Sequence, residues 1–272
     1  MGWRENWLIF FSVIICFSLL KIDFYGLDDK QSNKINLGNS ATQITVSCAA
    51  SLKNIMEEIK PLYEQKYSQT QLIYNFGSSG SLQRQIEQGA PVDVFISAAD
   101  KQINALEKKG LLLEGTRYDL VSNKIVLIVP KNHNKNKVNI TNFTDLTNTN
   151  ITKIALGEPQ SVPAGKYAQE VLHYYKITEQ INAKAVYGKD VRQVLNYVAT
   201  GNVDAGIVYL TDAKIEDEVK VVTTAPSGSH SPVVYPIAVV KDSKNPQESK
   251  QLINFLSTSE IQTMFTKYGF SK

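Results

Sequence analysis

The sequence predicts an α/β protein with two hydrophobic cores, and three observations support this class. Short apolar runs of strand type alternate with amphipathic helical segments, which favours largely parallel sheets. The pattern contains about ten strands, more than one open sheet usually holds. A stretch dense in Asn, Lys and Thr, residues 131–150, separates the strands into two groups. We therefore expect two cores, although the halves share no sequence repeat.

The composition is that of a globular protein without a nucleic-acid face. Of the 272 residues, 43% are hydrophobic and 20% charged, and 29 Lys and Arg against 26 Asp and Glu leave a formal charge of +3. The charges are scattered, with no run of five like charges. Charge therefore identifies no partner, and a nucleic acid is not expected.

The first 41 residues are typical of an export signal or N-terminal anchor followed by a polar linker. Residues 7–20 are nearly all apolar, follow Arg4, and are fewer than the roughly 20 that span a bilayer. Bulky residues precede Cys16 where a lipoprotein signal carries a small one, so lipidation at Cys16 is the less favoured interpretation. In every case the folded part, from near Thr42, should face the periplasm or the outer side of the cytoplasmic membrane.

The first predicted units repeat strand, small polar turn and helix. Residues 43–50 form a strand, and Ser51 follows as N-cap or first-turn residue of a helix. A cap that only stabilises its helix is the alternative. Residues 71–76 form the next strand, after which Gly77 and Gly80 admit close approach of a ligand to the backbone, and Ser78 and Ser79 supply donors at a helix start.

A strand at residues 91–97 contains one charge, Asp93, whose carboxylate we expect to cap a neighbouring loop. A helix over residues 100–109 should stop at Gly110. The apolar run 124–129 predicts another strand, closed by a proline.

A turn-rich run, residues 157–167, links the strand at 153–156 to a long amphipathic helix. Pro163 suits the first helical turn, so the amides of Ala164 and Gly165 should point unpaired out of the helix N-terminus, where anions bind.

The last third of the chain continues the alternation. Asp190 is the expected N-cap of a helix whose first residue is Val191, and Tyr209 lies at the carboxyl end of a strand, the side on which open α/β sheets bind ligands. The predicted strands are 183–187, 203–210, 219–222 and 233–240. The helical runs end at Gly201, at Leu256 and in residues 268–270, and one short helix lies near 143–146.

Groups for catalysis or metal binding are missing from the pattern. His133, His173 and His230 have no metal-ligand spacing, and only Asp93 and Asp190 lie at predicted strand ends. The sequence therefore favours a binding protein over an enzyme.

A serine hydrolase is a remote alternative. Ser51 or Ser79 would be its nucleophile, but no histidine base is placed beside either residue, and neither a nucleophile-elbow nor a phosphate-loop pattern occurs. Cys48 has no partner if Cys16 belongs to the signal, so we expect a small buried residue and no disulfide framework.

Helix N-termini supply the positive charge of the expected site. The four helix ends at Ser51, Ser79, Ala164 and Val191 all follow strands and should open at the carboxyl edges of their sheets. At about +0.5 of a charge each they sum to about +2, which matches a dianion without Lys or Arg. Amide donors suit an ion that carries no proton.

Six runs of residues resemble the molybdate-binding proteins of ABC importers. In chain order they are Thr45–Leu52, Phe76–Leu82, Gly89–Ala98, Gly157–Gly165, Asp190–Arg192 and Gly206–Tyr209. The resemblance implies a type II periplasmic-binding-protein fold, with two mixed, mostly parallel sheets flanked by helices and joined by two crossing strands. Lobe I would comprise residues 42–122 and 230–272, and lobe II residues 123–229.

The resemblance also implies a ligand set. Ser51 and Ser79 would hold molybdate through hydroxyl and amide, Ala164 and Val191 through their amides, and Tyr209 through its hydroxyl. These residues would contact the oxygens of the ion, with no direct metal ligand and no cofactor. The choice of Tyr209 over its neighbours comes from the resemblance alone.

The function so implied is capture of molybdate, with tungstate as a second ligand, by an exported monomer that delivers it to the permease and ATPase subunits of an ABC importer. A sulfate- or phosphate-binding protein of the same fold is the rival. Arg84 and Arg192 are candidates for a supporting layer, although solvated surface positions are the more common outcome. Cys48 departs from the family pattern and could make the site sensitive to oxidation.

Overall fold

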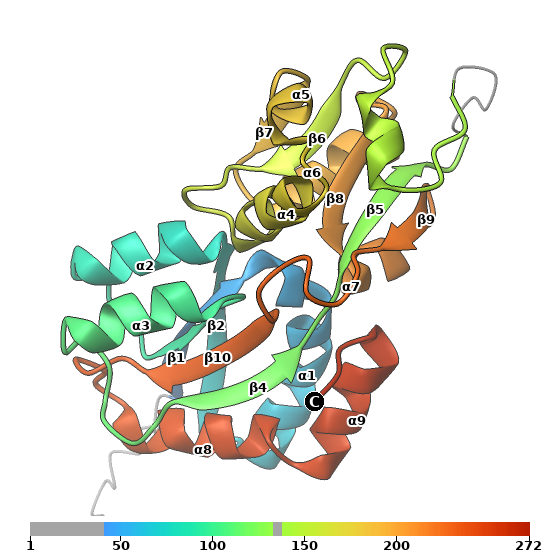
Figure 1. Cartoon of the computed structure of the whole chain (residues 1–272). Helices are drawn as coiled ribbons and strands as arrows, with labels where there is room; N and C mark the ends of the chain where they lie inside the picture. Colours follow the sequence, from blue (N-terminus) through green and yellow to red (C-terminus); the bar gives the residue numbers. More distant parts are fainter. Residues whose placement is uncertain (1–40, 133–137) are drawn as a thin grey trace, which may run out of the picture. The chain divides into compact units, whose positions relative to one another are not determined.

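Two five-stranded mixed sheets carry the fold (Figure 1). The computed structural model describes residues 41–132 and 138–272, all of which belong to one compact unit, Asn39–Lys272. The predicted signal, Cys16 and His133 lie outside the described residues. The lobe boundaries at residues 122 and 229 stay a prediction.

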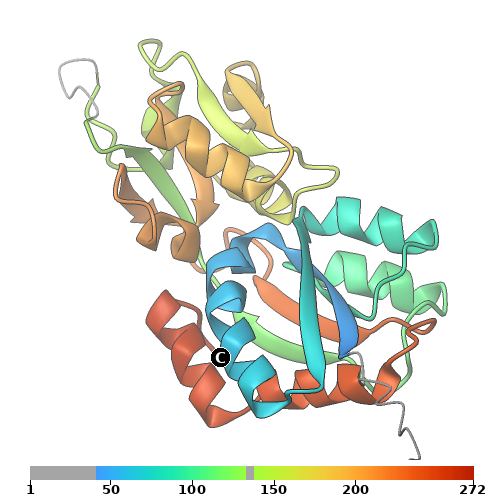
Figure 2. The ribbon, with the colours of Figure 1, turned by 180° about the vertical axis from the view of Figure 1, so that it is seen from behind.

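The first sheet has the order β2-β1-β3-β10-β4. β2, β1 and β3 are parallel, and β10 runs antiparallel to both of its neighbours. Helices α2 and α3 cover one face, and α1, α8 and α9 cover the other (Figures 1 and 2). The elements are β1 Thr42–Ala49, the 3-10 turn η1 Ala50–Leu52, α1 Lys53–Lys66, β2 Thr70–Gly77, α2 Ser79–Glu87, β3 Val94–Ile96, α3 Asp100–Lys108, β4 Tyr118–Ser122, β10 Val234–Val239, α8 Pro246–Leu256 and α9 Ser259–Tyr268.

The second sheet has the order β7-β6-β8-β5-β9. β7, β6 and β8 are parallel, and β5 runs antiparallel to β8 and β9. Helix α4 lies on one face and α6 on the other (Figures 1 and 2). The elements are β5 Ile125–Pro130, η2 Phe143–Thr147, β6 Ile154–Gly157, α4 Pro163–Tyr174, α5 Thr178–Asn182, β7 Ala185–Gly188, α6 Val191–Ala199, β8 Ala205–Tyr209, α7 Leu210–Lys214 and β9 Val219–Thr224.

The chain passes between the sheets twice, from β4 into β5 and from β9 into β10. Each sheet contains one strand that is antiparallel to the other four, β10 in the first sheet and β5 in the second. This is the predicted two-sheet arrangement.

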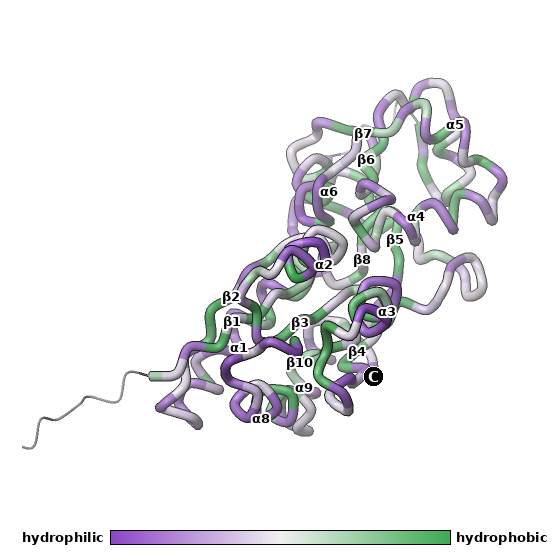
Figure 3. The backbone as a smooth tube through the Cα atoms, turned by 90° about the vertical axis from the view of Figure 1, so that its left-hand side faces the viewer, coloured by the Kyte–Doolittle hydropathy of each residue, from purple (hydrophilic) through white to green (hydrophobic). Residues whose placement is uncertain are grey.

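Buried apolar residues fill the space between strands and helices, and hydrophobic stretches follow the strands of both sheets (Figure 3). The prediction of two separate cores is wrong, because most buried apolar residues of both sheets join one cluster. Tyr209 and Tyr235 help to join them by packing edge to face with ring centroids 5.8 Å apart. A smaller cluster lies between α2, α3 and the first sheet.

Three short elements were not predicted: β4, α5 and α7. β4 is an edge strand whose first two residues, Tyr118 and Asp119, are exposed, so it lacks an apolar run. Pro61 lies inside the single helix α1. Within the described ranges, every helix is too short or too polar to cross a membrane.

Candidate functional site

A small cavity lies where strand ends and helix starts of the two sheets meet. We call it the cleft cavity. Its volume is about 10 Å³, close to the space of one water molecule. All five predicted site residues line it, together with Ala49, Ala50, Gly77, Ser78, Ala98, Val162 and Pro163.

Ser51 reaches the cavity from the 3-10 turn that leads into α1, which agrees with the predicted first-turn position and not with the predicted N-cap. It lies inside the 3-10 turn η1, and α1 begins only at Lys53, so Ser51 caps no α-helix. Its hydroxyl is 2.8 Å from the Tyr235 hydroxyl. The estimate of four helix dipoles therefore falls to three, or about +1.5 charges.

Ser79 is the first residue of α2, as predicted, and Ser78 is the N-cap. The Ser79 hydroxyl oxygen accepts a hydrogen bond of 2.9 Å from the backbone amide of Ala98. Because that amide uses a lone pair of the oxygen, the hydroxyl hydrogen of Ser79 is left to donate into the cavity.

Gly80 brings the two sheets together rather than admitting a ligand. Its amide donates to the Ser161 carbonyl at 2.9 Å, and a Cβ on Gly80 would lie 2.6 Å from that oxygen. The expected ligand approach is thus wrong for Gly80, because the backbone of the loop before α4 occupies the space, whereas Gly77 lines the cleft cavity.

Helix α4 begins at Pro163, as predicted. The Gly165 amide donates to the Val162 carbonyl at 2.9 Å, so the prediction that it is unpaired is wrong. Ala164, fully buried, keeps an amide without an intrahelical partner. A Cβ on Gly165 would lie 2.0 Å from the Gly157 oxygen, so glycine is needed for this helix to start against β6.

Val191 and Tyr209 complete the set. Asp190 is the N-cap of α6 and accepts from the Gln193 amide at 2.9 Å, as predicted, which leaves Val191 as the first helical residue. The Tyr209 hydroxyl is buried and makes no hydrogen bond within the part of the chain that the structure describes. Burial, and next the neighbouring Tyr235, raises the pKa of Tyr209, so its hydroxyl stays a proton donor.

Arg192 forms a supporting layer behind the cavity. Its Nε and Nη2 donate to the carbonyls of Ala50 and Ser51, each at 3.2 Å, and Nε lies 2.9 Å from Asp212 Oδ1. The expectation of a solvated surface position is wrong for Arg192, because β8 and α7 place a buried carboxylate beside it. Arg84 is exposed on α2 and matches that expectation.

None of the described residues that line the cavity has a charged side chain. Asp93 instead binds the loop after β10, accepting from the Ser243 hydroxyl at 2.6 Å, as predicted for a loop cap.

Cys48 is fully buried, and burial raises the pKa of its thiol, which opposes the suggested oxidation sensitivity. Residues 41–132 and 138–272 hold no cluster of three His, Cys, Asp or Glu that could bind a metal.

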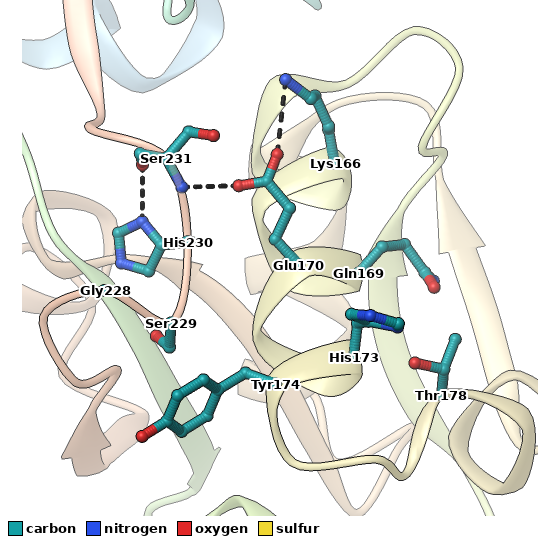
Figure 4. A pocket seen from close by; sticks show the side chains of 10 residues that line it. All are labelled: Lys166, Gln169, Glu170, His173, Tyr174, Thr178, Gly228, Ser229, His230 and Ser231. Atoms are coloured by element: carbon teal, nitrogen blue, oxygen red, sulfur yellow. Dashed lines mark hydrogen bonds and ion pairs between the residues drawn. The ribbon is translucent and has the colours of Figure 1, made fainter.

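A second, larger pocket of about 620 Å³ is lined by α4, the start of α5 and residues 228–231 (Figure 4). We call it the α4 pocket. Glu170 in its wall accepts from the Ser231 amide at 2.6 Å and pairs with Lys166 at 3.3 Å. The remaining lining residues are Gln169, His173, Tyr174, Thr178, Gly228, Ser229 and His230. Sequence analysis singled out none of these for binding.

The fold and the cavity define a class of protein. Residues 44–271 match the model of the family described as bacterial extracellular solute-binding protein, and the chain belongs to this family. Membership confirms that it is a binding protein and not an enzyme, and that the class is an extracellular one.

Three individual proteins are similar to this chain over most of its length. The chain is 41% identical over 98% of both chains to Bacillus subtilis YvgL, provisionally named an ABC transporter substrate-binding lipoprotein. It is 34% identical to the molybdate-binding protein ModA of Haemophilus influenzae, covering 85% of this chain and 91% of that one. Among solved structures, the substrate-binding domain of a provisionally named molybdenum ABC transporter from Clostridium difficile is 42% identical, with a TM-score of 0.65 over 85% of this chain and 99% of that one.

Sequence reasoning missed the residues that support the site from behind. Asn123, Tyr235 and Asp212 are all buried beside the cavity residues. Asn123 comes directly before one predicted strand, and Tyr235 lies within another. Neither residue has a local sequence pattern that marks it as part of a site.

Proposed function

We propose that the protein captures molybdate, and tungstate as a second ligand, in the cleft cavity and delivers it to an ABC import permease driven by an ATPase. The observation that carries the proposal is the convergence of five donors on one cavity without a charged wall residue. The buried Tyr209 hydroxyl, which lacks a partner among described residues, supports it further. Buried donors of this kind are costly unless a ligand uses them.

The chemistry of the wall suits a fully deprotonated tetrahedral oxyanion. Three helix N-termini face the cavity, and dipoles of this kind stabilise an anion without a cation. A protonated oxyanion such as hydrogen phosphate needs an acceptor for its proton, and the wall offers no carboxylate. The names of the relatives from Haemophilus influenzae and Clostridium difficile point to the same ligand.

Isothermal titration with molybdate, tungstate, sulfate and phosphate tests the proposal. We expect tight binding of molybdate and tungstate, weaker binding of sulfate, and no heat from phosphate. Tight sulfate binding without molybdate heat would show that the protein is a sulfate-binding member of the same fold.

Replacing Val191 by proline tests the role of an amide. Proline is tolerated at the first helical position, and Asp190 before it has the extended backbone that a residue before proline adopts. We expect Val191→Pro to fold and to bind molybdate about tenfold more weakly, from the loss of one hydrogen bond to a charged group. Unchanged affinity in the folded variant would exclude this amide from the site.

We propose in addition that the chain is exported and held at the outer face of the cytoplasmic membrane by a lipid attached to Cys16. The lipoprotein name of Bacillus subtilis YvgL supports this, although the residues before Cys16 are bulky. Wild-type protein should incorporate a labelled fatty acid, and Cys16→Ser should not. Membrane-held wild type without label would indicate an uncleaved anchor instead.

A further inference from the structure

Behind Ser51, a chain of buried hydrogen bonds leads from the β4–β5 crossing to the cleft cavity. Asn123 Nδ2 lies 3.3 Å from the Tyr235 hydroxyl, which lies 2.8 Å from the Ser51 hydroxyl. All three residues are buried. The direction of each bond decides whether Ser51 meets a ligand as donor or as acceptor.

The orientation of the Asn123 amide fixes the first direction. The backbone amide of Lys124 donates to Asn123 Oδ1 at 2.8 Å, and an N–H group can only donate. The atom facing Lys124 must therefore be the oxygen. The NH₂ group then points the other way and donates to the hydroxyls of Tyr235 and Thr211, the latter at 2.9 Å.

The Tyr235 hydroxyl fixes the direction of the second hydrogen bond. Its hydroxyl has two partners among the described residues, Asn123 and Ser51. It accepts from Asn123, so its one hydrogen is satisfied only by donating to Ser51 Oγ, since a buried hydroxyl hydrogen without an acceptor is costly. Ser51 Oγ accepts that bond and keeps its own hydrogen for the cavity that it lines.

We propose that Asn123 and Tyr235 are positioning residues that hold the Ser51 hydroxyl as a donor toward the ligand, and so select a fully deprotonated oxyanion over a protonated one. The inference rests on the proposed function and deepens it. The Ala98 amide imposes the same polarity on Ser79, so both serines would face the ligand as donors.

The substitution Asn123→Asp reverses the chain with almost no change in shape. One carboxylate oxygen keeps the Lys124 bond, while the other replaces the NH₂ group by an acceptor. Tyr235 then donates to residue 123 and accepts from Ser51, which turns a lone pair to the cavity. We expect molybdate affinity to fall at least about tenfold, and the molybdate-to-phosphate affinity ratio to fall further, because the site gains an acceptor.

Tyr235→Phe separates the relay from the added charge. The phenyl ring keeps the packing but cuts the chain, so Asn123→Asp in that background should change molybdate affinity by less than about threefold. A charge acting through space would weaken binding equally in both backgrounds. Equal losses, or no loss from Asn123→Asp alone, would overturn the inference.

A second cycle remains decisive if Asn123→Asp does not fold. Tyr235→Phe should weaken molybdate binding about threefold when Ser51 is present and have no effect when combined with Ser51→Ala. Equal effects in both backgrounds would mean that Tyr235 acts on packing and not through Ser51. Thermal melting of each ligand-free variant verifies that it is folded.

The two proposals fail separately. If the wild-type protein binds sulfate and not molybdate, the proposed function fails, and the cycles are measured with sulfate. If it binds molybdate and both cycles show additive effects, only the relay fails.

Discussion

The cleft cavity lies at the first residues of α4, the α4 pocket lies further along the same helix, and the two are lined by different kinds of polar group. The cleft cavity, about 10 Å³, has no charged wall residue. The α4 pocket, about 620 Å³, contains a carboxylate, a lysine and two histidines. The comparison teaches that anion binding here depends on fixed, buried donors rather than on the size of a pocket or its formal charge.

The buried carboxylate behind the cleft cavity gives the largest expected effect. Burial raises the pKa of Asp212 from 3.8 to about 6. Of the neighbouring groups, Arg192 and the Tyr209 backbone lower this pKa, and Asp190 raises it. Between pH 4 and 6 the folded protein therefore holds a proton that the unfolded chain has released. The contribution of Asp212 to the free energy of unfolding is greatest below pH 4 and is lost as the pH rises through 6, by roughly 3 kcal/mol in all.

Chemical denaturation of wild type and Asp212→Asn from pH 4 to 8 measures this contribution as a difference. The difference cancels the carboxylates whose pKa values are lowered, such as Glu87 and Asp145, which act in the opposite direction. We expect wild type to lose stability relative to the variant as the pH rises. Parallel pH curves would show that Asp212 is ionised throughout.

Tyr209→Phe separates binding from stability at the cavity wall. The hydroxyl has no partner within the described structure, so its removal should leave the ligand-free melting temperature unchanged or higher. The same change removes a donor to a charged ligand and should weaken molybdate binding by about 1.5–3 kcal/mol, or roughly tenfold to a hundredfold. A variant with lower melting temperature and normal affinity would reverse both assignments.

Gly80→Ala tests whether contact between the sheets is part of binding. The new Cβ would lie 2.6 Å from the Ser161 carbonyl, which is backbone and cannot rotate away. We expect about 1–2 kcal/mol weaker molybdate binding from overpacking, measured by titration. Gly89→Ala serves as the control for backbone conformation, because Gly89 has a φ of +84° but no atom near its Cβ. It should cost stability and leave affinity unchanged.

Local rules predicted much of the site from the sequence. Pro163 at a helix start and Asp190 as N-cap depend on a few neighbouring residues, and both were located correctly. Ser51 was placed correctly at a helix entry, but the choice between N-cap and first turn was left open, because it depends on how η1 packs. Asn123 and Tyr235 could not be found, since their bonds join residues 112 and 184 positions apart. Polar contacts of such sequence separation leave no periodic signal.

The smallest expected effect concerns the α4 pocket. Glu170→Gln removes the only carboxylate that lines this pocket and breaks its ion pair with Lys166, whereas the amide oxygen can still accept from Ser231. Because the pair is partly exposed, with the Glu170 side chain at 27%, the free energy of unfolding should change by less than about 1 kcal/mol. Molybdate affinity should stay within about twofold of wild type, since no wall residue of the cleft cavity is touched. If removing this negative charge strengthened molybdate binding tenfold, the ion would be sensing charge across α4, and the contrast between fixed local donors and general electrostatics would fail.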